Sequence, residues 1–156
     1  NMLLILNLSL LAGMILIGFI PNILKRFKLS QIDIYLCITI VLLIGHSILT
    51  FELIPKSSIP WILIGVSANS AILAYSWLNS QFPLSYSGRA STALNLSLFV
   101  CGFLLQYAIG WIINFWERNS DNMYPAEAYS VAFGILLVLQ IFCIGIFLIL
   151  KPRRLL

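Results

Sequence analysis

The sequence contains very little charge for its length. Only 9% of its 156 residues are Asp, Glu, Lys or Arg, whereas 61% are hydrophobic. A soluble domain carries about a quarter charged residues, so this chain lacks the polar side chains that a water-exposed surface needs. The composition therefore excludes a soluble globular domain and predicts a protein embedded in a lipid bilayer.

Residues that bind metals or carry out catalysis are equally scarce. There is one histidine, and Cys37, Cys101 and Cys143 all lie inside apolar runs, which indicates neither a disulfide framework nor a metal cluster. The motifs HExxH, CxxC, GxSxG and the phosphate-binding loop are absent. The sequence thus predicts no cofactor, no metal site and no catalytic residues, and the protein is not expected to be an enzyme.

The net charge of +4 does not indicate a nucleic-acid partner, because the basic residues stand at the ends of apolar runs and form no single basic surface. What the chain has instead is long apolar runs, at residues 2–24, 32–54, 60–82, 92–115 and 128–150. Each run is about 23 residues long and as a helix would cross a hydrocarbon core of about 30 Å. None alternates with the period of two that a β-barrel strand requires.

The predicted fold class is therefore an all-α membrane protein with five transmembrane helices and a short tail, 151–156. Seven of the nine Lys and Arg residues fall in "KRFK" after the first run, in the connector after the third run, and in the tail. Because Lys and Arg concentrate in cytoplasmic loops, these segments are predicted to be cytoplasmic, as is the C-terminus.

The connector after the third run, "FPLSYSGRASTALN", is the most polar interruption of the apolar pattern. Pro83 is expected to end a helix, since the residue before a proline disfavours helix. Gly88 is expected to allow a tight turn, and Ser87 or Ser91 to cap the next helix. Arg89 lies at the mouth of that helix and is expected to act there as a cytoplasmic anchor or gate.

The fourth run carries polar residues into the membrane. At 100° per residue, Asn95, Gly102, Gln106 and Gly110 fall on one stripe of the helix. An amide in hydrocarbon needs a partner, because an unsatisfied one costs several kcal/mol. Hydrogen bonds between helices would be one explanation. For the stripe as a whole we favour a water-filled cavity that handles a solute.

The third run repeats this pattern less clearly, with Asn69 and Ser76 on one face. Tyr75, Trp77 and Asn79 are further candidates, although an aromatic residue near the end of a span is more often an interfacial anchor.

His46, near the middle of the second run, is compatible with a proton relay. A structural, hydrogen-bonded histidine is favoured, because no acidic residue lies nearby within the apolar run.

The stretch "FPLSYSGRASTALNLSLFVCGFLLQYAIGWII" resembles the region that joins the tenth and eleventh helices of permeases of the major facilitator superfamily (MFS). In that family a helix ends at a proline, the loop carries Gly-Arg and a small residue, and the next helix carries an Asn and later a Gly. The corresponding residues here are Pro83, Gly88, Arg89, Asn95 and Gly110. The pattern is similar to a bacterial subgroup of unassigned substrate, which implies the bacterial inner membrane.

This resemblance implies that the five spans are helices eight to twelve of a twelve-helix permease, and that the chain is part of something longer. The first half of the permease would then be a partner, along with the lipid bilayer, a small-molecule substrate and a coupling proton or cation. In "GFIPNILKRF" the family's first-loop motif is degraded, with Asn22 at the Asp position. The substrate-facing candidates that the resemblance implies are Asn69, Tyr75, Ser76, Asn95 and Gln106.

Two alternatives remain open from the sequence. A chain of five spans could be a non-catalytic integral membrane subunit or assembly factor. A membrane enzyme would have to pair His46 with a serine across helices, and the permease fits the connector "SGRASTALN" better than either.

Overall fold

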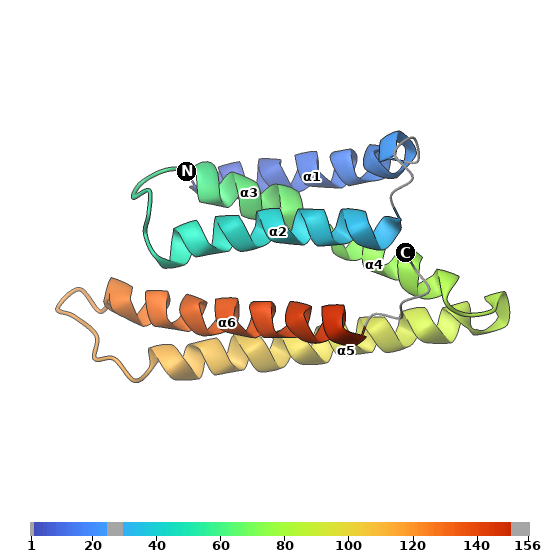
Figure 1. Ribbon diagram of the computed structural model, residues 1–156. Helices are drawn as coiled ribbons and strands as arrows, with labels where there is room; N and C mark the ends of the chain where they lie inside the picture. Colours follow the sequence, from blue (N-terminus) through green and yellow to red (C-terminus); the bar gives the residue numbers. More distant parts are fainter. Residues whose placement is uncertain (1, 25–29, 151–156) are drawn as a thin grey trace.

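The computed structural model describes residues 2–24 and 30–150, without the side chains of 21–24 (Figure 1). The described chain is helical and contains no strand. Its helices are α1 (Met2–Leu24), α2 (Gln31–Thr50), α3 (Ile59–Ala68), α4 (Ala71–Ser80), α5 (Leu84–Ile113) and α6 (Ala126–Leu150).

Five segments of the described chain are long and apolar enough to cross a membrane, with α3 and α4 together forming one of them. Large apolar side chains on the outside of the helix bundle, such as Leu3, Phe99 and Ile149, are more than 70% exposed. Such a surface suits lipid and is unsuited to water, since a soluble protein seldom exposes continuous apolar patches of this extent. The all-helical fold with five apolar helices of membrane-spanning length is thereby confirmed.

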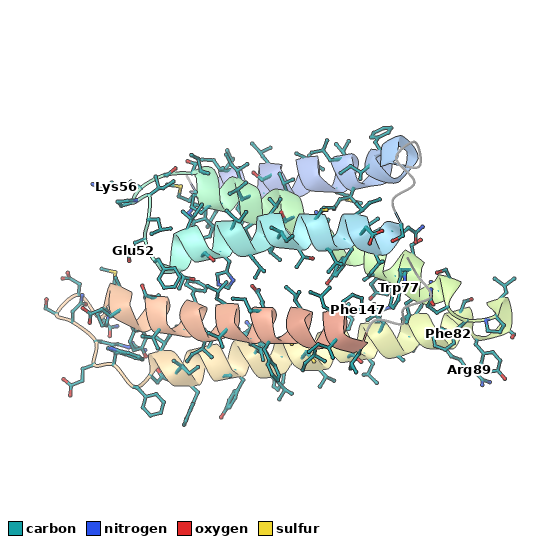
Figure 2. All side chains as sticks on the ribbon, in the orientation of Figure 1. Glu52, Lys56, Trp77, Phe82, Arg89 and Phe147 are labelled. Atoms are coloured by element: carbon teal, nitrogen blue, oxygen red, sulfur yellow. The ribbon has the colours of Figure 1, made fainter. Side chains whose placement is uncertain are left out.

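The connectors alternate between the two ends of the bundle (Figures 1 and 2). Connectors 51–58 and 114–125 lie at one end, which we call the Lys56 end. Connector 81–83 and the last turn of α6 lie at the opposite end, which we call the Arg89 end. Residues 25–29 and 151–156, on which the predicted sidedness also depends, lie outside the described residues.

Each helix packs against particular neighbours. α3 contacts both α1 and α2, α2 also contacts α4 and α6, and α5 contacts α4 and α6. A small buried cluster of Ile17, Ile34 and Leu73 joins α1, α2 and α4. Near the Arg89 end, Trp77 of α4 meets Phe147 of α6 edge to face, with 5.9 Å between ring centroids (Figure 2). Among the described helices α2 therefore has the most neighbours, namely α3, α4 and α6.

The contact between α1 and α3 depends on glycine. A Cβ added to Gly13 would lie 2.3 Å from the carbonyl oxygen of Val66, and one added to Gly65 would lie 2.6 Å from Cβ of Ser9. Close backbone approach of this kind is how membrane helices gain packing energy, because lipid offers no hydrophobic drive to association. These two glycines thus set the distance between the two helices.

α2 ends four residues earlier than the predicted limit of 54. Leu53 N–H donates to the carbonyl of Ile48 (3.1 Å) and Glu52 N–H donates to that of Leu49 (3.4 Å), while Glu52 adopts φ 48°. This is the Schellman arrangement, in which a left-handed residue reverses the chain and satisfies the last carbonyls of the helix. The approaching Pro55 cannot continue a helix, which accounts for the early end.

The third predicted span, 60–82, is present, but it is broken in the middle. α3 ends at Ala68 and α4 begins at Ala71, with Asn69 and Ser70 between them. Short hydrogen bonds bridge the break, from Ser70 N–H to Ser67 O (3.0 Å) and from Leu73 N–H to Ser70 O (2.9 Å). The sequence here has no proline, but Ser and Asn side chains compete with the backbone for hydrogen bonds and weaken a helix interior.

The start of α5 differs from the expectation. The fourth span was predicted to begin at 92 after a turn at Gly88, whereas α5 begins at Leu84 and Gly88 lies inside the helix. The chain turns at 81–83, and Pro83 (φ −55°, ψ 149°) stands at the N-cap. Proline suits a helix start, because its fixed φ and missing N–H cost nothing there. No proline follows between residues 84 and 113, so α5 continues through the polar stretch that contains Gly88 and Arg89.

The two serines proposed as caps have other roles. Ser87 Oγ donates to the carbonyl of Leu84 within the helix (2.9 Å), and Ser91 Oγ donates to Asn79 Oδ1 of α4 (3.0 Å). Ser91 therefore joins two helices instead of capping one.

We predict that Gly13→Ala lowers the free energy of unfolding by about 1–3 kcal/mol, because the added methyl group would overlap Val66 and push α1 away from α3. Thermal or detergent-induced unfolding followed by circular dichroism measures this. The matched control is Gly18→Ala on the same helix, where an added Cβ meets no atom within 4 Å. Equal effects of the two substitutions would contradict the glycine contact.

Candidate functional site

The structure brings two of the predicted site residues together between α4 and α5. The hydroxyl of Tyr75 donates a hydrogen bond to Oδ1 of Asn95. One turn nearer the Arg89 end, Ser91 bonds to Asn79 in the same way. The spacing of four residues on both helices places the two pairs in register, because residues i and i+4 share a helix face. α4 and α5 are thus joined by a short polar ladder.

Asn69 occupies a different place. It lies at the break of the third span, and its Nδ2 donates to the carbonyl oxygen of Leu10 on α1 at 2.8 Å. Ser70 beside it is only 6% exposed, and Ser67 is fully buried with a hydroxyl that has no partner in the described chain. The break is therefore held against α1 by Asn69, and it leaves polar groups in the interior of the bundle.

Ser76 and Gln106 are exposed, and neither makes a hydrogen bond to another described residue. Along the predicted stripe of α5, a Cβ added to Gly102 or Gly110 would meet nothing within 4 Å. No residue of α5 is buried. An amide such as that of Gln106 cannot face hydrocarbon without a large cost, so this stripe requires water or further protein against it.

The stripe borders the packed side of α5. The half-buried residues Leu94, Leu105, Ala108 and Ile112 turn towards α4 and α6. At 100° per residue the stripe lies roughly a third of a turn away from them. Beyond the stripe lies an open row of aromatic residues spaced four apart, each more than half exposed: Phe99, Phe103, Tyr107, Trp111 and Phe115.

Arg89 is exposed in the second turn of α5, at the end of the bundle to which it gives its name (Figure 2). Its guanidinium carbon lies 5.7 Å from the centre of the Tyr86 ring. Gly88 next to it has open space around it. The side chain of Arg89 therefore lies at the end of the bundle, several helical turns away from Gln106.

One polar contact was not found from the sequence. His46 of α2 is 7% exposed, and its Nδ1 lies 2.9 Å from Oε1 of Gln140 on α6. Gln140 is a lone amide within an apolar run, the same signal that selected Asn95 and Gln106. That signal could have identified the residue, but its pairing with His46 depends on how α2 and α6 pack.

The chain matches no protein-family model, no curated protein and no solved structure. Its function is therefore inferred from the residues and contacts described above.

We predict that Tyr75→Phe lowers the free energy of unfolding by about 0.5–1.5 kcal/mol, because it removes the hydrogen bond to Asn95 within the membrane. The measurement is detergent-induced unfolding of the purified protein. Tyr86→Phe serves as the control, since the Tyr86 hydroxyl makes no hydrogen bond to another described residue and its ring beside Arg89 is retained. If both variants unfold like the wild type, the polar ladder does not stabilise the contact between α4 and α5.

Proposed function

We propose that this protein is a secondary active transporter of the MFS type, which moves a small solute by alternating access. The chain would supply helices eight to twelve of the C-terminal half. One observation carries the proposal: α5 presents an uncovered polar stripe beside the Tyr75–Asn95 contact and next to a broken span. Such a combination is expected where a solute passes through a membrane protein.

The broken third span supports this reading. Irregular backbone at membrane depth is tolerated only where it is buried in protein or lines a water-filled cavity. In secondary transporters, discontinuous helices of this kind often form the substrate and ion sites near the midplane. Asn69 and Ser70 place such a break near the middle of the span that α3 and α4 form.

The uncovered polar stripe of α5 also supports the proposed transporter. Asn95 and Gln106 lie on the stripe, which is a less favourable surface for lipid than the apolar outer faces of α1 and α6. In an alternating-access transporter the other half of the protein, and the aqueous path between the halves, would face this stripe. The stripe carries amides and no charge, which suits a neutral or weakly charged solute on this side of the path, with a proton or cation as the coupling ion.

We place the Arg89 end in the cytoplasm of a bacterial inner membrane, because most of the Lys and Arg residues belong to the connectors and tail of that side. Arg89, in the second turn of α5, would then anchor or gate the cytoplasmic mouth of the path.

The second candidate is a non-catalytic membrane subunit or assembly factor. The row of exposed aromatic residues on α5, from Phe99 to Trp111, favours it, because aromatic residues are enriched where proteins bind one another. In that case the polar stripe would be covered by a partner and would remain dry.

Labelling of introduced cysteines distinguishes the two functions without knowledge of the substrate. In a background in which Cys37, Cys101 and Cys143 are replaced by Ala, Gln106→Cys is treated with a membrane-impermeant maleimide in membrane vesicles. A transport path predicts that this cysteine reacts, because only a hydrated thiol forms the reactive thiolate. The control is Leu104→Cys, at the same depth on the opposite side of α5 and 57% exposed as leucine.

Labelling of Gln106→Cys at least about tenfold faster than that of Leu104→Cys is the result expected for a water-lined path. Absence of labelling at both positions, from either side of the membrane, would contradict the transporter and favour the subunit.

Uptake into proteoliposomes then tests the role of the stripe. Loss of transport in Asn95→Ala and Gln106→Ala is expected, and Ser97→Ala, whose hydroxyl only bonds back to Ala93 O (2.9 Å), is the control.

A further inference from the structure

A cavity of about 210 Å³ lies between α2, α3 and α6, away from the stripe of α5. Apart from His46 and Gln140 its lining is apolar. It consists of Leu42 and Leu49 of α2, Trp61 and Ile64 of α3, and Phe133 and Leu136 of α6. No charged side chain lines it. The cavity therefore suits a neutral molecule, and two aromatic rings, of Trp61 and Phe133, contribute to its wall.

His46 brings one unpaired polar atom to this cavity. The residue is only 7% exposed, and its imidazole stands edge-on to the ring of Phe133, with 5.9 Å between centroids. Its Nδ1 bonds to Gln140 Oε1, and its Nε2 has no partner among the described residues. Trp77 Nε1 also lacks a partner, but it is fully enclosed by protein, whereas Nε2 of His46 is not among the enclosed atoms.

The bond to Gln140 determines what Nε2 can do. An amide oxygen only accepts hydrogen bonds, so the contact between Nδ1 and Gln140 Oε1 is a hydrogen bond in the tautomer that carries its proton on Nδ1. In the neutral ring Nε2 is then an acceptor. A ligand that satisfies this nitrogen must therefore donate a hydrogen bond.

We propose that this cavity is a binding site for a small neutral phenol-class molecule, whose hydroxyl donates to Nε2 of His46 while its ring lies against Trp61 and Phe133. An apolar cavity of about 150 Å³ accepts benzene, so a volume of about 210 Å³ accommodates one substituted aromatic ring. Gln140 is a positioning residue, because it holds the histidine in the accepting tautomer. This site does not depend on the proposed transport function, which stands whether or not the phenol binds.

The test uses 4-bromophenol as the probe, because bromine quenches tryptophan fluorescence at close range. The protein is placed in phospholipid nanodiscs with Trp61 as its single tryptophan, after Trp77, Trp111, Trp116 and any tryptophan outside these 156 residues are changed to Phe. We expect saturable quenching by 4-bromophenol. Bromobenzene, which has the ring and the bromine but no hydroxyl, should bind roughly tenfold more weakly, as expected for the loss of one buried hydrogen bond.

Two matched proteins complete the experiment. A protein with Trp111 as its single tryptophan reports the probe dissolved in lipid, since Trp111 is 59% exposed on α5, and its quenching should not saturate. The double variant His46→Phe/Gln140→Leu removes both partners of the hydrogen bond, which is nearly neutral for folding, and it should bind both probes equally. Its unfolding profile is measured to show that it is folded.

The outcomes separate clearly. A preference for 4-bromophenol that disappears in the double variant supports the site. Unsaturable quenching of Trp61 by both probes means that the ligand only partitions into the bilayer, and it overturns the proposal. Saturable binding of both probes with equal affinity by the wild-type protein also overturns it, because His46 would then play no part in recognition.

Discussion

Every polar group that these helices carry into the membrane has to find a partner, because hydrocarbon offers none and an unsatisfied amide costs several kcal/mol. The described chain meets this requirement in a few places only. Asn69 bonds to the backbone of α1, Asn95 to Tyr75, and His46 to Gln140. These contacts involve all five spans, joining the third span to the first and the fourth and the second span to the fifth. They specify which helix lies beside which, since apolar packing alone is nearly indifferent to the choice of neighbour.

The same requirement explains the broken third span. The break between α3 and α4 interrupts the regular helical hydrogen bonds within the span, and the short bonds of Ser70 and Leu73 satisfy backbone groups there. The side chain of Asn69 adds a hydrogen bond to the carbonyl of Leu10, which holds the break against α1. The close glycine contacts at Gly13 and Gly65 hold α1 against α3 on one side of this break. The irregular backbone is thus surrounded by protein on the side of α1 and α2.

α5 is the helix on which the requirement is not met by the described chain. Gln106 is exposed and Gly102 has no neighbour, whereas Thr39 and His46 of α2 are both buried and hydrogen-bonded. This imbalance is the physical basis of the proposed transport path, in which water and a second set of helices face the stripe. The cavity at His46 is the opposite case, because there a buried histidine lines a largely apolar space between helices. The two places call for different ligands, a hydrated solute at the stripe and a neutral aromatic donor at His46.

The sequence by itself determined the membrane class, the five spans to within a few residues at most ends, and the stripe of polar residues on the fourth run. These follow from composition and from a period of 3.6 residues, which are local properties. Only the tertiary structure decided that Tyr75 meets Asn95 and that His46 meets Gln140, ninety-four positions along the chain. It also placed Gly88 and Arg89 inside α5 and divided the third span at Asn69. Pairing between helices and the point where a helix breaks depend on which neighbours supply the missing hydrogen bonds, and a pattern along one chain segment does not contain that information.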